Sequence, residues 1–230
     1  MYKLGILGGM SYESTQVYYQ IINQEINKKL KKSHSAELVM YSFDYDEIEE
    51  LLIKDRWDLI KNRLVEEGLK LKLIGAKGLI LCANTVHIVA DFVEKEVGLP
   101  LIHIVKETYQ AVQNQSLKKV GLIGTSYTMK SGIYHNYFKD RGIEVVVPKE
   151  EDQNLIHDVI YQELIVGKYS DLSRNKILDI IKRMDVEGII LGCTELPLLI
   201  LDKDLAISRF DTMEIHAKAA ANWMIKGENR

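Results

Sequence analysis

The two cysteines, Cys82 and Cys193, are the side chains of this chain best suited to proton transfer or nucleophilic attack. Each stands at the end of a short apolar run and precedes small amide, hydroxyl or carboxylate side chains. A cysteine thiol can donate a proton, and its thiolate can accept one or attack a substrate. Neither cysteine lies in a CxxC or HxxxH spacing, so the pattern argues against a zinc site, and no metal is expected.

An internal repeat relates the segments that carry the two thiols. Residues 77–85 (KGLILCANT) match residues 187–195 (EGIILGCTE) without a gap. In this alignment Cys193 corresponds to Ala83, and Cys82 stands one residue earlier. The repeat therefore predicts that the two cysteines do not occupy equivalent positions.

A second repeated pair extends this relationship over the chain. Residues 5–8 (GILG) match residues 121–124 (GLIG), in the same order as the first pair and at a similar separation. Ordered matches of this kind indicate two related halves. We expect a first half-domain over 1–100 and a second over 101–212, with part of a final helix, 213–225, packing back on the first.

The elements that must position these residues alternate between apolar runs and amphipathic stretches. Short apolar runs bounded by glycine and separated by helices indicate an α/β fold, in which each half is a mostly parallel sheet flanked by helices. We expect strands at 2–7, 38–43, 77–81, 101–105, 120–123, 143–147 and 188–191 and helices at 11–30, 46–73 (broken near 55–56), 85–97, 107–114, 127–139, 152–166, 171–184 and 213–225.

Four predicted strand ends carry small polar side chains: 8–15, 82–85, 124–128 and 193–195. Ligands of α/β proteins bind beyond the carboxyl ends of parallel strands, so we expect these segments to converge on one cleft. The helix N-termini that follow them favour a carboxylate, because their backbone N–H groups are unpaired. The alternative for each segment is a helix cap without further function.

Composition limits the class of partner. The chain has 30 Lys and Arg against 33 Asp and Glu, and its net charge of -3 argues against nucleic-acid binding. No apolar run approaches the length of a membrane span. Because no basic leader or cleavage site precedes the first apolar run, we expect a cytoplasmic protein with free thiols and a small-molecule ligand.

Three segments together resemble the aspartate/glutamate racemase superfamily: residues 8–15 (GGMSYEST), Asn84-Thr85, and residues 192–195 (GCTE). The resemblance covers essentially the whole chain, and the opening segment looks closest to the broad-specificity aspartate/glutamate branch. It implies two pseudo-symmetric α/β half-domains with the active site between them. It also implies a homodimer that acts on a small acidic amino acid without pyridoxal phosphate, metal or other cofactor.

The implied chemistry is racemisation by two cysteines. One thiolate removes the Cα proton while a thiol on the opposite face delivers another. Because a Cα–H beside a carboxylate is a very weak acid, the site must stabilise an enolate-like dianion with N–H and O–H donors. It must also lower the thiol pKa values, and we expect helix N-termini to do so.

The chain departs from the superfamily at the first thiol. The family pattern is Cys-Asn-Thr, whereas Ala83 precedes Asn84 here, and Cys82 stands one step too early. Successive side chains of a strand point to opposite faces, so we expect Cys82 to point into the packed interior. The alternative is a loop that turns Cys82 towards the substrate. Cys193 matches the family motif in register and is the principal catalytic candidate.

The resemblance also nominates substrate-binding residues. Lys168 is similar to a family lysine that pairs with a substrate carboxylate, and the alternative is an ordinary lysine at a helix end. Glu195 either caps the helix after Cys193 or orients a neighbour. The full set of substrate-binding candidates is Met10, Ser11, Ala83, Asn84, Thr85, Thr125, Thr128, Lys168, Thr194 and Glu195.

Two histidines have a potential role. His87, just after Thr85, either faces the cleft as a base or is solvated. His216 is similar to a family position near the second thiol. The remaining four have no pairing that the sequence reveals: His34, His103, His135 and His157.

Three functions remain open. The first is racemisation of aspartate, glutamate or both by Cys193, with a redirected Cys82, Thr85 or a water serving the other face. The second is a one-thiol relative similar to arylmalonate decarboxylases, in which a single cysteine protonates an enediolate. The third is an amino-acid-binding protein with weak or no catalysis.

Overall fold

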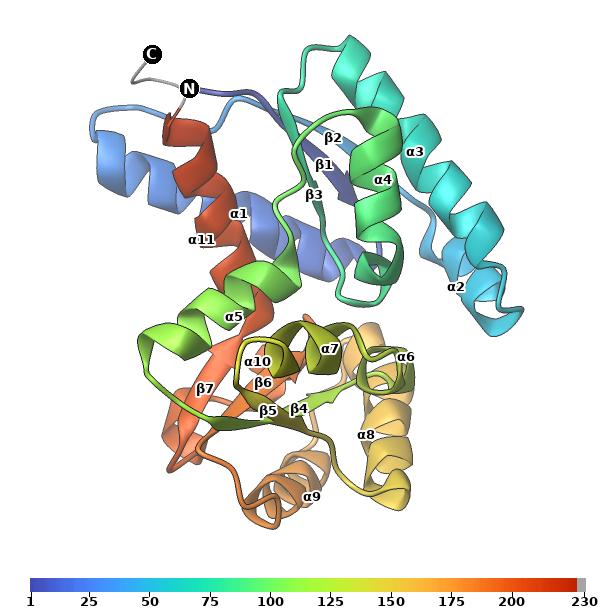
Figure 1. The fold of residues 1–230 in the computed structure, drawn as a ribbon, viewed down its shortest axis with the longest axis vertical. Coiled ribbons are helices and arrows are strands. Elements are labelled where there is room, and N and C mark those ends of the chain that lie inside the picture. The colour runs from blue at the N-terminus through green and yellow to red at the C-terminus, as the bar shows by residue number, and fades with distance from the viewer. Residues whose placement is uncertain (227–230) are drawn as a thin grey trace. The chain divides into compact units, whose positions relative to one another are not determined.

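The computed structural model describes residues 1–226, which form two compact units (Figure 1). The first unit comprises Met1–His103 together with residues 216–226, and the second comprises Ile104–Ile215. The last helix, α11 (Thr212–Lys226), begins in the second unit and continues in the first. No helix within residues 1–226 has an apolar stretch long enough to cross a lipid bilayer.

The first unit contains a three-stranded parallel sheet in the order β2-β1-β3. The central strand, β1 (Leu4–Gly8), is buried at every residue. In Figure 1 the strands of this sheet run between α1 and α11 on the left and α3 and α4 on the right. Helices on both faces explain why β1 is an uninterrupted apolar run. The other elements are β2 (Leu38–Ser42), β3 (Gly78–Leu81), α1 (Tyr12–Leu30), α2 (Tyr45–Ile53), α3 (Trp57–Leu73), the 3-10 segment η1 (Thr85–Val89) and α4 (Ala90–Val97).

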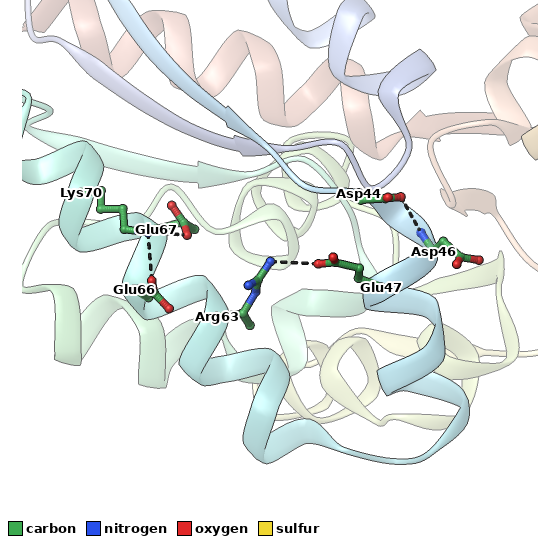
Figure 2. Close-up of polar contacts among 7 residues, drawn as sticks. All are labelled: Asp44, Asp46, Glu47, Arg63, Glu66, Glu67 and Lys70. Atoms are coloured by element: carbon green, nitrogen blue, oxygen red, sulfur yellow. Dashed lines mark hydrogen bonds and ion pairs between the residues drawn. The ribbon is translucent and has the colours of Figure 1, made fainter.

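Polar side chains join α2 to α3 and line α3 (Figure 2). Arg63 of α3 donates to the Glu47 carboxylate of α2 at 3.0 Å. Lys70 reaches Glu66 at 2.9 Å and Glu67 at 2.8 Å. Glu67 differs from the others because it is only 2% exposed, and its Oε2 has no hydrogen-bond partner among the described residues. The core face of α3 therefore contains a half-satisfied carboxylate.

The second unit contains a four-stranded parallel sheet in the order β5-β4-β6-β7. Alternate residues of β6, and Cys193 directly after it, join different hydrophobic clusters: Ile189, Leu191 and Cys193 pack with residues of α8 and α9, and Ile190 packs with residues of α5 and α7. The elements are α5 (Ile104–Asn114), β4 (Lys119–Gly124), α6 (Ser126–Lys130), α7 (Ile133–Lys139), β5 (Glu144–Val146), α8 (Glu150–Gln162), η2 (Leu164–Val166), α9 (Asp171–Lys182), β6 (Gly188–Gly192), α10 (Leu196–Leu199), η3 (Asp202–Asp204) and β7 (Ser208–Asp211).

Several expected elements differ from the observed ones. The strand expected at 101–105 is wrong, because Leu101 forms only an isolated bridge with Leu79 and α5 begins at Ile104. The helix expected at 127–139 is two helices, separated where Gly132 adopts a φ of 77°. The strand β7 was not expected at all.

Candidate active site

The pairing of β1 with β3 in the first unit has the same register as the pairing of β4 with β6 in the second. Leu7 is opposite Leu81 in the first unit, and Ile123 is opposite Leu191 in the second. Counting onward from these pairs, residue 82 corresponds to residue 192 and Ala83 corresponds to Cys193. Once residues 5–8 are matched with residues 121–124, strand pairing assigns the same correspondence as the match of residues 77–85 with 187–195.

Cys82 lies inside the first unit. Its backbone N–H donates to the Leu7 carbonyl at 3.0 Å, and its side chain is fully buried. Burial raises the pKa of the Cys82 thiol well above its ordinary value of 9.0. This environment is that of a packing residue and gives no support to a catalytic Cys82.

The residue that corresponds to Cys82 in the second unit is Gly192. A Cβ atom placed there would lie 2.8 Å from Cδ1 of Leu122 and 3.1 Å from the Ile123 carbonyl oxygen. These distances are too short for any side chain without a shift of the neighbours. A side chain at 192 would therefore require the Leu122 side chain to move, whereas the first unit holds a buried thiol at the matching position.

Cys193 forms a compact polar group with the two residues that follow it. Its Sγ donates to Oε2 of Glu195 at 3.0 Å, and Oγ1 of Thr194 donates to the same oxygen at 2.8 Å. The exposed fractions are 8% for Cys193 and 5% for each of the other two residues. The Glu195 carboxylate thus orients its neighbours, as one of the two sequence alternatives proposed.

The electrostatics of Cys193 differ from the expectation of a lowered thiol pKa. Burial raises the pKa of Cys193 well above 9.0, and the Glu195 charge and hydrogen bond raise it further. Backbone N–H groups of Glu195 and Leu196 act in the opposite direction, but their effect is smaller. The helix expected to lower the pKa is only the four-residue α10. Because burial and the Glu195 charge raise the pKa, Cys193 is a protonated thiol near neutral pH.

In the first unit, Met10 and Ser11 follow β1 and are each 6% exposed. Ser11 is the N-cap of α1, and its Oγ accepts from the Ser14 N–H at 3.4 Å. Thr15 closes the turn, because its hydroxyl donates to the Ser11 carbonyl at 2.8 Å and accepts from the Gly9 N–H at 2.9 Å. The segment is a helix cap, and its substrate-binding role remains a proposal.

At the end of β3, Asn84 is buried and Thr85 is half-buried. The Asn84 carbonyl accepts the His87 backbone N–H at 3.0 Å. The His87 side chain is 2% exposed and its Nδ1 lies 2.8 Å from the Ala83 carbonyl oxygen. The alternative of a solvated His87 is therefore wrong.

In the second unit, Thr125 caps α6 and lies close to Thr128. The Thr128 N–H donates to Oγ1 of Thr125 at 3.3 Å, the two hydroxyl oxygens are also 3.3 Å apart, and both residues are buried. Lys168, by contrast, is exposed after Gly167 and makes no ion pair within residues 1–226. Its pairing with a substrate carboxylate remains a proposal.

Sequence reasoning missed two residues at this edge, Asp211 and Thr212. The pairing of Leu191 with Asp211 puts the end of β7 beside the end of β6. Thr212 Oγ1 donates to the Leu191 carbonyl at 2.8 Å, two residues before Cys193. Burial raises the pKa of Asp211, which accepts the Glu214 N–H at 3.0 Å. An Asp three residues before a Glu at a helix start is the signal that could have found them.

The second unit thus brings together Cys193, Thr194 and Glu195, with Asp211 and Thr212 on the adjacent strand end. Within residues 1–226, no three His, Cys, Asp or Glu side chains form a cluster that could hold a metal ion. The chemistry that the group can perform is proton donation by the thiol, with a carboxylate at hydrogen-bond distance to take the proton.

Known proteins of similar sequence and structure include racemases and racemase homologues. A candidate Asp/Glu racemase from Yersinia pestis is 41% identical, with a TM-score of 0.92 over 98% of this chain and 100% of its own. An aspartate racemase homologue from Pyrococcus horikoshii OT3 is 32% identical, with a TM-score of 0.82 over 100% of both chains. The broad-specificity amino-acid racemase RacX of Bacillus subtilis (strain 168) is 26% identical over 68% of this chain and 69% of its own.

These neighbours confirm the predicted α/β fold with two related halves, and they confirm the resemblance to the racemase superfamily. The family model of the Asp/Glu/hydantoin racemases matches residues 7–220, which is nearly the whole chain. The chain therefore belongs to the Asp/Glu/hydantoin racemase family.

Proposed function

We propose that this protein racemises an acidic amino acid, aspartate, glutamate or both, with Cys193 exchanging the proton on one face of Cα. The observation that carries the proposal is the contact of Cys193 Sγ with Oε2 of the buried Glu195 carboxylate at 3.0 Å, at the carboxyl edge of β6. The names of the aspartate racemase homologue and of RacX support an amino-acid substrate.

The geometry supports a two-step use of the thiol. As an acid, Cys193 delivers its Sγ proton to the Cα carbanion and becomes a thiolate. As a base, it first passes its proton to Oε2 of Glu195, and the thiolate then removes the Cα proton. The Thr194 hydroxyl donates to the same carboxylate oxygen and holds it in place. Asn84, Thr85, Thr125 and Thr128 are the proposed substrate contacts.

The opposite face of Cα lacks a matching thiol, because Ala83 occupies the equivalent position. Thr85 or a water would serve that face, and both are weak bases towards a Cα–H. We therefore expect slow turnover, with proton exchange much faster from one enantiomer than from the other.

Cα deuterium uptake in heavy water tests the proposal. Each enantiomer of aspartate and glutamate is incubated with the protein, and Cα–H loss is followed by NMR. We expect uptake that is fast for one enantiomer and abolished by Cys193→Ala. Equal, fast uptake from both enantiomers contradicts a one-thiol site. No uptake, with amino-acid binding that Cys193→Ala leaves intact, favours a binding protein.

A second candidate reaction is decarboxylation of a malonate-type acid, similar to that of arylmalonate decarboxylases. One observation favours it: Ala83, not a second cysteine, corresponds to Cys193, so these two positions supply a single thiol acid. Protonation of an enediolate formed by loss of carbon dioxide needs only that acid. Release of carbon dioxide from a panel of substituted malonates separates this reaction from racemisation.

The resemblance also leads us to propose a homodimer that acts without pyridoxal phosphate. Light scattering coupled to size exclusion measures the first property. The absorbance spectrum of the purified protein, with an activity assay after dialysis against hydroxylamine, measures the second.

A further inference from the structure

Three histidine rings and a tyrosine form a buried cluster in the first unit that the proposed mechanism does not use. His87 of η1 has its ring centroid 4.9 Å from that of His103 and 5.4 Å from that of His216 of α11. The Tyr18 ring of α1 meets His216 edge-on at 5.6 Å. The exposed fractions are 2% for His87, 9% for His103 and 0% for the other two.

Hydrogen bonds to carbonyl groups fix which nitrogens of this cluster carry protons. Nδ1 of His87 lies 2.8 Å from the Ala83 carbonyl oxygen, which can only accept, so Nδ1 carries the proton and donates. Nε2 of His216 donates to the Ile102 carbonyl at 2.6 Å for the same reason. Nδ1 of His216 then accepts from the Tyr18 hydroxyl at 2.9 Å.

Both rings are neutral. Burial, with the neighbouring rings of His103 and His216, lowers the pKa of His87 well below its ordinary value of 6.5. Burial likewise lowers the pKa of His216 to about 4.

The carbonyl that His87 holds belongs to the turn that follows β3. This turn presents Asn84 and Thr85, and Ala83 occupies the position of the missing thiol. The second unit stabilises its corresponding turn differently. There the carbonyl of Cys193 accepts the backbone N–H of Leu196 at 3.3 Å, and the residue that corresponds to His87 is Pro197, which has no side-chain donor.

We propose that His87 is a positioning residue for substrate binding. Its Nδ1–H fixes the Ala83 carbonyl and thereby the orientation of Asn84 and Thr85. The rings of His103 and His216 pack against it and keep it in that orientation. The claim that this turn binds an amino acid rests on the proposed function. The claim that His87 fixes the turn through its hydrogen bond to Ala83 does not.

Two substitutions separate the hydrogen bond from the bulk of the ring. His87→Leu removes the donor and keeps an apolar side chain, whereas His87→Asn places an amide N–H at the position of Nδ1. Hydrogen–deuterium exchange of the full chain then reports on the turn, because the His87 N–H donates to the Asn84 carbonyl within it. Ile26→Val, a buried change on α1, is the control for general loss of stability.

We expect His87→Leu to speed exchange of the peptide covering 82–88, His87→Asn to restore protection, and Ile26→Val to leave that peptide unchanged. Equal exchange in the Leu and Asn variants, or no change in the Leu variant, overturns the positioning role. These outcomes do not depend on catalysis, so they hold even if deuterium uptake shows that the protein is not a racemase.

Kinetics test the connection to substrate. Without the Nδ1–H donor the turn no longer holds Asn84 and Thr85 in one orientation, so we expect His87→Leu to raise KM for the exchanged amino acid about ten-fold or more, with a smaller fall in kcat. His87→Asn should stay close to the parent KM. An unchanged KM in a Leu variant whose turn does exchange faster overturns the proposed effect on substrate binding.

Discussion

The Cys193 thiol and the Thr194 hydroxyl donate to one oxygen of Glu195, at 3.0 Å and 2.8 Å. The carboxylate therefore stabilises the protonated thiol and adds to the effect of burial on its pKa. Glu195→Gln removes the charge and keeps an oxygen acceptor, so we expect the pKa of Cys193 to fall. Ultraviolet absorbance of the thiolate against pH, in a Cys82→Ala background, measures the change.

Thr194→Val is the matched control for this titration. It removes a hydroxyl that partly neutralises the carboxylate and leaves the charge in place. The pKa of Cys193 should then stay as high as in the parent. A Glu195→Gln protein that titrates like the parent contradicts the role given to the Glu195 charge.

Ala83→Cys should add the missing thiol. Because Ala83 and Cys193 occupy equivalent register positions, a cysteine at 83 supplies an acid or base for the second face of Cα. General acid–base groups contribute on the order of a hundred-fold or more, so racemisation should rise by about that factor. The rate is measured by circular dichroism with each enantiomer of aspartate and glutamate.

Cys82→Ala is the companion experiment. Cys82 is fully buried, so its truncation should cost about 1 kcal/mol of unfolding free energy and leave the rate constant for exchange unchanged. Loss of activity in this variant, with the fold intact by circular dichroism, argues for the redirected Cys82 that the structure does not favour.

Glu67→Met should stabilise the first unit. The Oε2 atom of Glu67 is buried and has no hydrogen-bond partner among the described residues, whereas its ion pair with Lys70 is partly exposed. Removal of an unsatisfied carboxylate oxygen outweighs the loss of such a pair, and we expect a gain of about 1 kcal/mol in urea unfolding. Glu66→Met, at an exposed position, should change stability little. A loss of stability in Glu67→Met refutes this assignment.

The buried histidines make the fold sensitive to acid. The folded pKa of His216 is about 4 against an ordinary 6.5, so the unfolded chain binds more protons between these values and stability falls as pH drops through that window. The shift corresponds to roughly 3 kcal/mol. Urea unfolding at stepped pH should show a flatter dependence in His216→Gln than in the parent. His34→Gln, at an exposed position, should follow the parent curve; parallel curves for all three proteins rule the effect out.

Strands and helices that follow a local pattern of apolar residues could be predicted from the sequence. The buried strands before Cys82 and Cys193 are continuous apolar runs, and their repeat already indicated that Ala83 corresponds to Cys193. The strand β7 could not be predicted, because Phe210 is its only apolar residue and its pairing with β6 is non-local. At 101–105 the apolar residues continue into the start of α5, which concealed the change of structure.

The electrostatics of the candidate site were harder to predict than the identity of its residues. The motif named Cys193 and Glu195, but the direction of the thiol pKa shift depends on burial and on a contact formed only in the folded turn. The histidine cluster draws on Tyr18, His87, His103 and His216, which no short window of sequence can connect.

The glycine at 192 has a consequence for anyone building hybrids of the two turns. Grafting the 192–195 tetrapeptide onto positions 82–85 would leave a small void in place of the Cys82 thiol, which a packed core tolerates at modest cost. The reverse graft would place a Cβ atom 2.8 Å from Cδ1 of Leu122 and 3.1 Å from the Ile123 carbonyl oxygen, so the Leu122 side chain would have to move and the β4 backbone would have to yield slightly. The segment from the second unit should therefore be tolerated in the first unit more readily than the segment from the first unit in the second.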